Sequence, residues 1–269
     1  MKFDLHTHHV RCGHADGDIE EYVLAAIDAG LGAIGISDHS PYFGSPDDQP
    51  QPGIAMARSD FANYVEEVLR LKQKYEGRIE VLLGIESDFF PEYAEVYREA
   101  YAPVPFDYII GSVHLSGGVS IFNRNRWKDL NEEQHLAHKL EYYDLIKQSA
   151  RSRMFDVLGH IDAMKGYYPA FSDIPAHSAI DETLQVIAEE QIAIEINTSG
   201  KTKTVGGWYP SDEILERALH YGVAVTFGSD SHVPSRVGDD WELVRERLKE
   251  IGFKDWIYFR KRQRVVVAL

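Results

Sequence analysis

The chain has 269 residues, of which 44% are hydrophobic and 26% are charged, and its formal net charge is −15. This composition is typical of a globular protein with a large core, and it excludes an extensively disordered chain. A surface of this charge would repel a phosphate backbone, which excludes a long nucleic acid as a natural substrate, although local cations or metal ions could still admit a small anionic one.

Short apolar runs alternate along the chain with amphipathic stretches of helical length, a pattern that indicates repeated βα units. No internal repeat or linker divides the sequence, so we expect a single domain spanning residues 1–269. The predicted strands are 2–5, 33–36, 79–84, 106–110, 155–158, 192–196 and 223–227, with 256–259 as a last strand or extended tail. The predicted helices are 18–29, about 59–71 with Ser59 as its cap, 131–149, 176–189, 211–220 and 237–250.

Polar side chains of metal-ligating type follow nearly every predicted strand. In a barrel the carboxyl ends of parallel strands converge on one mouth, whereas an open sheet would spread these groups along a line. The sequence therefore favours an α/β barrel with its site at the C-terminal ends of the strands. The residues concerned are His6, His8, His39, Glu86, His114, His160, Asn197, Asp230 and His232.

This group of histidines and acids predicts a metal site. His6 and His8 are two residues apart at a strand end, so both side chains point to the same side. Buried histidines and carboxylates are costly unless they are hydrogen-bonded or coordinated. Glu86 can bridge two ions through its two oxygens. Asp38 is expected to contact a ligand or to face outward rather than to bind metal.

The remaining histidines and the single cysteine lack this placement. Cys12 is interpreted as a small buried or loop residue, and as the only cysteine it excludes an intramolecular disulfide and suits a reducing compartment. No run approaches the roughly 18 apolar residues of a membrane span, and the N-terminus lacks a secretory signal, so we expect a cytoplasmic protein without membrane contact. Surface or helix positions are predicted for His9, His135, His138, His177 and His220.

Several segments together resemble the polymerase-and-histidinol-phosphatase (PHP) superfamily, and within it the histidinol-phosphate phosphatases of amino-acid biosynthesis. The similarity covers nearly the whole chain, and the set of motifs is highly specific for the superfamily. The segments are HTHHVRCGHADGDIEEYVLAA, SDHSP, GIESDFFP, SVH, GHID, EINTSG and FGSDSH, in that order.

The resemblance implies a distorted seven-stranded barrel that binds three divalent metal ions, for which zinc, iron and manganese all suit the nitrogen and carboxylate ligands. Carried over to this chain, the first ion would be held by His6, His8, Glu86 and Asp230. Glu86 would bridge to a second ion that also binds His114 and His160. The third ion would be held by His14, His39 and His232.

A water bridging two such ions would become a hydroxide that attacks phosphorus in line. We expect the substrate to be L-histidinol phosphate, and the candidate catalytic residues are Glu86, Asp230 and His232. Asp230, or a histidine beside it, would help to move the proton. The alternatives are another small phosphate monoester, a nucleotide end or phosphotyrosine as substrate, or a non-catalytic metal-binding accessory domain.

Candidate residues for binding the substrate follow the sixth and seventh strands. Relatives often carry an arginine shortly after the NTSG motif, and this chain lacks it, so a lysine is expected to take its place without the planar bidentate fork of arginine. The loop after His114 carries Trp127, which could contact an imidazole ring or anchor the loop to the barrel. The candidates for substrate binding are Asn197, Ser199, Lys201, Lys203 and Arg236.

Overall fold

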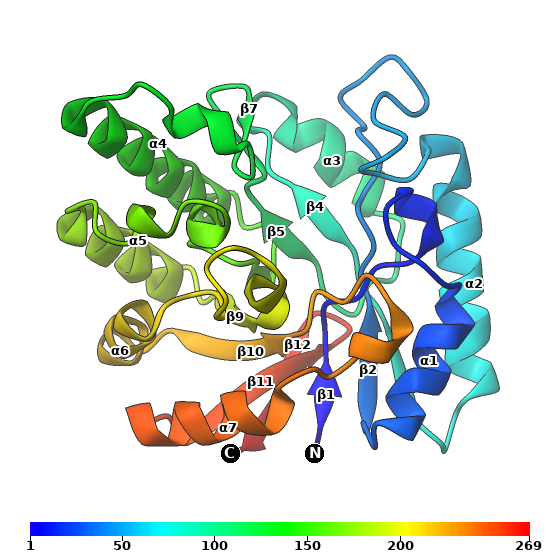
Figure 1. Ribbon diagram of the computed structural model, residues 1–269. Coiled ribbons are helices and arrows are strands. Elements are labelled where there is room, and N and C mark those ends of the chain that lie inside the picture. The colour runs from blue at the N-terminus through cyan, green and yellow to red at the C-terminus, as the bar shows by residue number, and fades with distance from the viewer.

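A computed structural model describes residues 1–269 and contains two parallel sheets (Figure 1). The first has the order β1-β2-β3, and the second has the order β10-β9-β8-β5-β4. The strands are β1 (Phe3–Asp4), β2 (Ala33–Ile36), β3 (Glu80–Leu83), β4 (Glu86–Asp88), β5 (Ile110–Ser112), β8 (Val157–Leu158), β9 (Ala193–Asn197) and β10 (Ala224–Gly228). Two hairpins add β6 (Leu115–Ser116) with β7 (Val119–Ser120), and β11 (Asp255–Arg260) with β12 (Gln263–Ala268).

The two sheets meet at both of their ends. An isolated parallel bridge pairs Thr7 with Ser231, beyond β1 and β10, and a second pairs His39 with Glu86, beyond β2 and at the start of β4. All strands in the two sheets are parallel to their neighbours, so their carboxyl ends lie on the same side. The residues that follow these strands are therefore gathered around one region.

Helices surround the sheets, with α1 and α2 on one side and α4, α5 and α6 on the other (Figure 1). Capping boxes begin two of them, Asp18 with Glu21 at α1 and Asn131 with Gln134 at α4. The α-helices are α1 (Ile19–Asp28), α2 (Phe61–Lys74), α3 (Ala94–Tyr101), α4 (Glu132–Arg151), α5 (His177–Glu189), α6 (Asp212–Tyr221) and α7 (Trp241–Ile251). Short 3-10 helices cover Val10–Cys12, Arg58–Asp60, Pro91–Tyr93, Arg124–Trp127, Ala163–Gly166, Pro169–Phe171, Thr198–Thr202 and Pro234–Arg236.

The structure corrects several predicted boundaries. The run 79–84 ends as a strand at Leu83, and a separate strand begins at Glu86 and pairs in the other sheet. At the break, a Cβ on Gly84 would lie 2.3 Å from the ring of Tyr108, so only glycine allows this approach. The strand predicted at 106–110 lies at 110–112 instead, and helix α3 was not predicted. Ser59 does not cap α2, because its hydroxyl donates to Asp48.

One cluster of 67 buried hydrophobic residues extends from Phe3 to Phe259 and joins the sheets to the helices. None of the helices is long and apolar enough to cross a membrane.

Lys139 of α4 is a buried cation that fixes the segment after Tyr168. Its ammonium donates to the carbonyl oxygens of Phe171 and Ile174, both at 2.8 Å, and burial lowers its pKa to about 8. Replacing Lys139 by methionine should lower the free energy of unfolding by about 2–3 kcal/mol, because two carbonyls lose their donor. Urea denaturation would measure this. The exposed Arg151→Met, on the same helix, should change it by less than about 0.5 kcal/mol, and equal effects of the two would contradict the prediction.

Candidate metal centre

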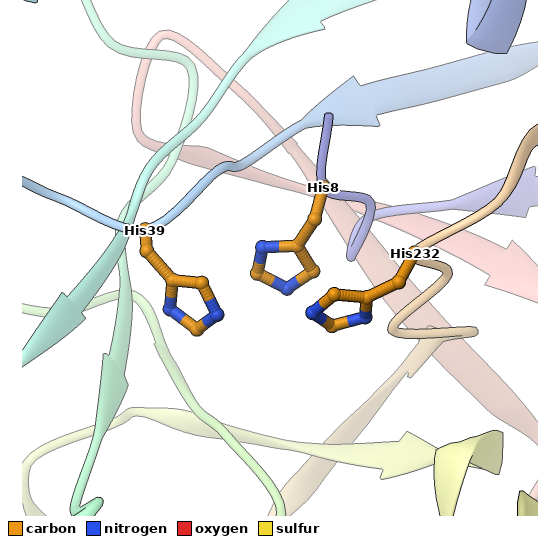
Figure 2. Close-up of side chains that lie close together, drawn as sticks. All are labelled: His8, His39 and His232. Carbon is orange, nitrogen blue, oxygen red and sulfur yellow. The ribbon is translucent and has the colours of Figure 1, made fainter. Parts of the chain in front are cut away.

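Three histidine rings from distant parts of the chain come together beyond the strand ends (Figure 2). His8 follows β1, His39 follows β2 and His232 follows β10. The ring of His8 lies 4.2 Å from each of the other two, centroid to centroid. Their nitrogens lie close enough together to hold one metal ion. Thus residues separated by more than 190 positions form one potential ligand set.

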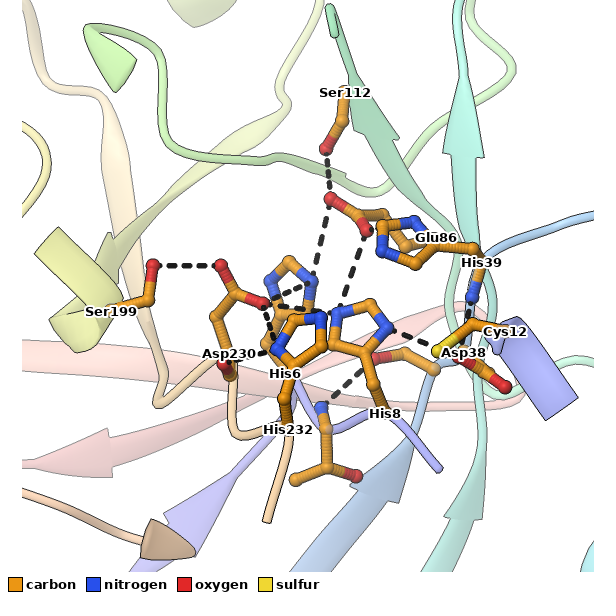
Figure 3. A network of polar contacts seen from close by, with 12 residues as sticks. His6, His8, Cys12, Asp38, His39, Glu86, Ser112, Ser199, Asp230 and His232 are labelled. Carbon is orange, nitrogen blue, oxygen red and sulfur yellow. Dashed lines mark hydrogen bonds and ion pairs between the residues drawn. The ribbon is translucent and has the colours of Figure 1, made fainter. Parts of the chain in front are cut away.

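Glu86 lies at the centre of the cluster and is buried. Its Oε1 accepts a hydrogen bond from Ser112 Oγ at 2.6 Å, which fixes the carboxylate (Figure 3). Both oxygens face histidines, so Glu86 is placed to serve two ions at once. The carboxylate-to-nitrogen distances are 2.8 Å to His39, 3.2 Å to His160, 3.4 Å to His6, 3.5 Å to His114 and 3.6 Å to His8.

Asp230 forms the other acidic side of the cluster. Its Oδ1 lies 3.0 Å from His8 Nε2 and 3.5 Å from His232 Nδ1. Its Oδ2 accepts from Ser199 Oγ at 2.8 Å and from Asn197 Nδ2 at 3.2 Å. The backbone of Asp230 is left-handed, with φ of 50°, a conformation that non-glycine residues adopt at a cost and that is common at functional sites.

Two further histidine pairs complete the group of predicted ligands. Nε2 of His14 lies 2.9 Å from Nε2 of His232, and Nε2 of His114 lies 3.1 Å from Nε2 of His160. Two neutral imidazole nitrogens can approach this closely only through a shared proton or a cation. The structure therefore brings together all nine residues that the sequence proposed as metal ligands.

Three carboxylates behind the cluster orient the histidine rings, and sequence reasoning did not assign two of them. Glu195 accepts from His6 Nδ1 at 2.8 Å, Asp88 from His114 Nδ1 at 2.9 Å, and Asp38 from His8 Nδ1 at 3.2 Å. Such contacts fix the tautomer of a ligating histidine and direct its other nitrogen to the metal. Asp38 thus contacts a ligand, as predicted. A charged residue inside the otherwise apolar strand IAIEIN could have revealed Glu195.

The prediction for His9 is wrong, because this residue is neither on the surface nor in an α-helix. It is 1% exposed, its Nδ1 lies 3.3 Å from Asp38, and its ring stacks on Tyr64. Cys12 is buried as predicted, with its thiol against the carbonyl of His9. Trp127 is buried and stacks on Tyr168 at 4.6 Å, so it anchors the loop and does not line the cavity.

The cluster has the charges and the unpaired atoms expected of a metal site. Its five carboxylates form ion pairs only with histidines, and no lysine or arginine neutralises them. Nε2 of His6, Nε2 of His8 and Oε2 of Glu86 are buried, and their contacts with oppositely charged neighbours do not have hydrogen-bond geometry. Buried polar atoms of this kind are costly unless a cation satisfies them. Divalent ions therefore fit the residues present.

The pKa directions of the two central carboxylates and of two histidines agree with this interpretation. Burial acts to raise the pKa of Glu86, but the surrounding histidines outweigh it and hold that pKa well below its usual value. The same balance lowers the pKa of Asp230. Burial and neighbouring histidines lower the pKa of His14 to about 4 and that of His232 to about 2. At neutral pH these carboxylates are ionised and these two imidazoles are neutral, which are the forms that bind metal.

Burial acts to lower the pKa of His6, His8 and His114, but nearby carboxylates outweigh it and raise the pKa of His6 well above its usual value and those of His8 and His114 to about 9. These three rings must therefore release a proton when a metal ion binds.

A cavity of about 980 Å³ opens over the cluster. Ser199, Lys203 and Arg236 line it, whereas Asn197 is buried beneath and Lys201 lies outside the lining. Lys201 pairs with Asp239 and Asp240, so the structure does not place it where the sequence predicted a substrate-binding cation. Four aromatic residues also line the cavity: Tyr42, Phe90, Tyr93 and Tyr97.

Residues 4–199 match the sequence profile of a protein family described as PHP domain. The chain belongs to the PHP domain family. Within this family it is of the histidinol-phosphatase type, as its sequence motifs indicated. It is 31% identical to the probable histidinol-phosphatase of Deinococcus radiodurans over 97% of both chains. It is 27% identical to the histidinol-phosphatase of Bacillus subtilis over 92% of this chain and 99% of the other.

A solved structure extends the similarity to the fold of this PHP-family chain. Histidinol phosphate phosphatase from Lactococcus lactis, in complex with zinc, L-histidinol and phosphate, matches with a TM-score of 0.80 over 98% of both chains, at 20% identity. The mixed α/β arrangement is therefore that of this family.

Proposed function

We propose that this chain is a metal-dependent phosphomonoesterase that hydrolyses L-histidinol phosphate to L-histidinol and phosphate in histidine biosynthesis. One observation carries the proposal: nine histidines and carboxylates converge beneath an open cavity, with five of the histidines around Glu86. Its near full-length similarity to a probable histidinol-phosphatase supports the choice of substrate.

The proposal extends to three divalent ions, zinc, iron or manganese. Their ligand sets are those that the family resemblance implies, with Glu86 shared between two ions. Some contacts fit this division, since His6, His8 and Glu86 lie close enough to hold one ion and His14 lies beside His232. The set of His8, His39 and His232 crosses it, so His8 is also placed near the third ion. His114 and His160 face each other, and both lie beside Oε1 of Glu86. Measuring the number of metal ions bound by variants that each lack one ligand would test this division.

We also propose that the two sheets form a distorted seven-stranded barrel, in which β3 and β4 are two halves of one broken strand. The contacts at both sheet ends support this arrangement, because they leave no wide gap between β1 and β10 or between β2 and β4. The metal centre would then lie at the C-terminal ends of the strands. The continuous hydrophobic core supports one domain over residues 1–269, and the single cysteine supports a cytoplasmic location.

Bound divalent ions would supply a water nucleophile of lowered pKa and would neutralise charge on the phosphoryl oxygens. The chain's own residues hold and orient the reacting groups. Ser112 fixes Glu86, whose two oxygens both face histidines. Ser199 donates to Oδ2 of Asp230, so that the other oxygen of Asp230 faces the cluster. Asp230, at the edge of the cavity, is placed to take the proton of the attacking water and return it to the leaving alcohol, with His232 beside it.

Steady-state kinetics on a panel of phosphate monoesters tests the substrate. Metal-loaded protein should hydrolyse histidinol phosphate with a kcat/KM at least about a hundredfold above that for a generic aryl phosphate or a nucleoside monophosphate, because a fitted polar site discriminates by several kcal/mol. Equal efficiency across the panel would refute the biosynthetic assignment and leave a general phosphoesterase. No hydrolysis of any ester would favour a metal-binding accessory domain.

A further inference from the structure

Three cations lie near the cavity above the metal centre, and two of them are neutralised by acids. Lys201 Nζ lies 2.8 Å from Asp240 and 3.2 Å from Asp239. Arg236 donates two hydrogen bonds to the same Asp239 carboxylate, at 3.1 and 3.2 Å. A cation already paired with a carboxylate binds a further anion only after that pair is broken or shared.

Lys203 is different, because aromatic rings hold it instead of an acid. Its Nζ lies 5.7 Å from the ring centre of Phe122 and 5.8 Å from that of Tyr167. All three side chains line the cavity, and no ion pair joins Lys203 to a carboxylate. Aromatic faces attract a cation through their quadrupole and do not neutralise its charge. The full positive charge of Lys203 is therefore available to an anion.

The segment that carries Lys203 is fixed close to the metal ligands. The backbone N–H of Lys203 donates to Gly200 O and closes the 3-10 helix Thr198–Thr202, which also carries Ser199. On the other side, the Phe122 ring lies 6.1 Å from the His114 ring and 6.4 Å from the His160 ring. Phe122 thus lies close both to Lys203 and to two of the predicted ligands.

The two rings also restrict one another. Phe122 and Tyr167 meet edge to face, with centroids 6.1 Å apart at 83°. Arg124, which is exposed, stacks over the Tyr167 ring at 4.4 Å and does not line the cavity. Phe122, Arg124, Tyr167 and Lys203 therefore form one cluster, of which all but Arg124 line the cavity.

We propose that Lys203 binds the phosphoryl group of the substrate, and that Phe122 and Tyr167 are positioning residues that hold its ammonium over the cavity without neutralising it. The proposal rests on the phosphomonoesterase function proposed above. Lys203 is chosen because Lys201 and Arg236 are already paired with carboxylates and Lys203 is not.

Lys203→Ala in the full-length, metal-loaded protein should raise KM for histidinol phosphate by roughly ten- to a hundredfold, because it removes a charge-assisted hydrogen bond to the phosphate. The inhibition constant of inorganic phosphate should rise by the same factor. Lys201→Ala is the matched control, since that lysine is tied to Asp239 and Asp240, and it should change both constants less than about twofold. Metal content must match wild type in both variants.

Phe122→Leu keeps an apolar side chain but removes one aromatic face. It should raise KM by roughly two- to fivefold at unchanged kcat, the size of one cation–π contact, and leave metal content unchanged. Lys203→Arg should recover most of the affinity lost in Lys203→Ala.

Equal effects of Lys203→Ala and Lys201→Ala on phosphate inhibition would overturn the inference. Calorimetric binding of inorganic phosphate separates this failure from that of the proposed function. If wild type hydrolyses no ester but binds phosphate through Lys203, the function fails and the lysine assignment stands. If wild type is active and Lys203→Ala binds inorganic phosphate as tightly as wild type does, only the lysine assignment fails.

Discussion

Replacing Glu86 by alanine should abolish most phosphatase turnover and remove bound metal in the same variant. Glu86 lies within 3.6 Å of five histidine nitrogens and is the one carboxylate in contact with all of them. Without it, the histidines that face it lose their shared anion, and the proposed ions would lose one of their ligands. We expect kcat to fall on the order of a thousandfold or more, because metal ions contribute several kcal/mol to such reactions.

Metal content by mass spectrometry and turnover of histidinol phosphate should be measured on the same preparation. Glu99→Ala, an exposed acid on the outside of α3, is the matched control and should leave both unchanged. Asp230→Ala should behave like Glu86→Ala, because Asp230 contacts His8 and His232. Near-normal turnover by a variant depleted of metal would exclude the proposed mechanism. Full metal content with lost turnover would mean that Glu86 acts in the chemical step and is not needed to bind metal.

The strand ends were the most informative feature of the sequence. Five of the seven predicted parallel strands, among them 33–36 and 223–227, lie within one residue of their observed bounds, because buried parallel strands are short apolar runs that end in polar residues. Once the strands were placed, His39 and His160 followed from position alone. That these residues bind metal stays a prediction, although the structure places them together.

The parts that sequence reasoning missed depend on contacts between distant segments. Asp88 lies outside the predicted strand 79–84, and the new strand after the break at Gly84 turns its carboxylate toward His114. The sequence alone does not distinguish Lys201 from Lys203 as a phosphate-binding residue. The structure does, because Lys201 pairs with Asp240 and Lys203 lies over the Phe122 ring. Helix α3 has few aliphatic residues, and its buried side is made of tyrosines, so periodicity of aliphatic residues did not indicate it.

Conservative replacement of Glu195, a buried residue outside the predicted ligand set, should weaken metal binding strongly. Its Oε2 accepts from His6 Nδ1 at 2.8 Å, and its Oε1 accepts from the backbone N–H of His160 at 3.0 Å and from Asn197 Nδ2 at 2.7 Å. One carboxylate thus orients two predicted ligands and the amide that contacts Asp230. Burial acts to lower the pKa of His6, and Glu195 is the largest of the acids that outweigh this effect and raise it.

Glutamine at position 195 keeps the shape of the side chain but replaces one carboxylate oxygen by an NH₂ group. This group would face a hydrogen-bond donor, so at least one of the contacts with His6, His160 and Asn197 must be lost. We expect metal affinity to fall by roughly 10–100-fold, the range typical of residues that orient histidine ligands. Turnover should fall at low metal concentration and recover as metal is added, which distinguishes loss of orientation from loss of the fold. Glu189→Gln, on the last turn of α5, keeps a similar change of charge away from the site and should bind metal like wild type. If Glu195→Gln titrates with metal as wild type does, the His6 ring is oriented by its coordination alone and not by Glu195.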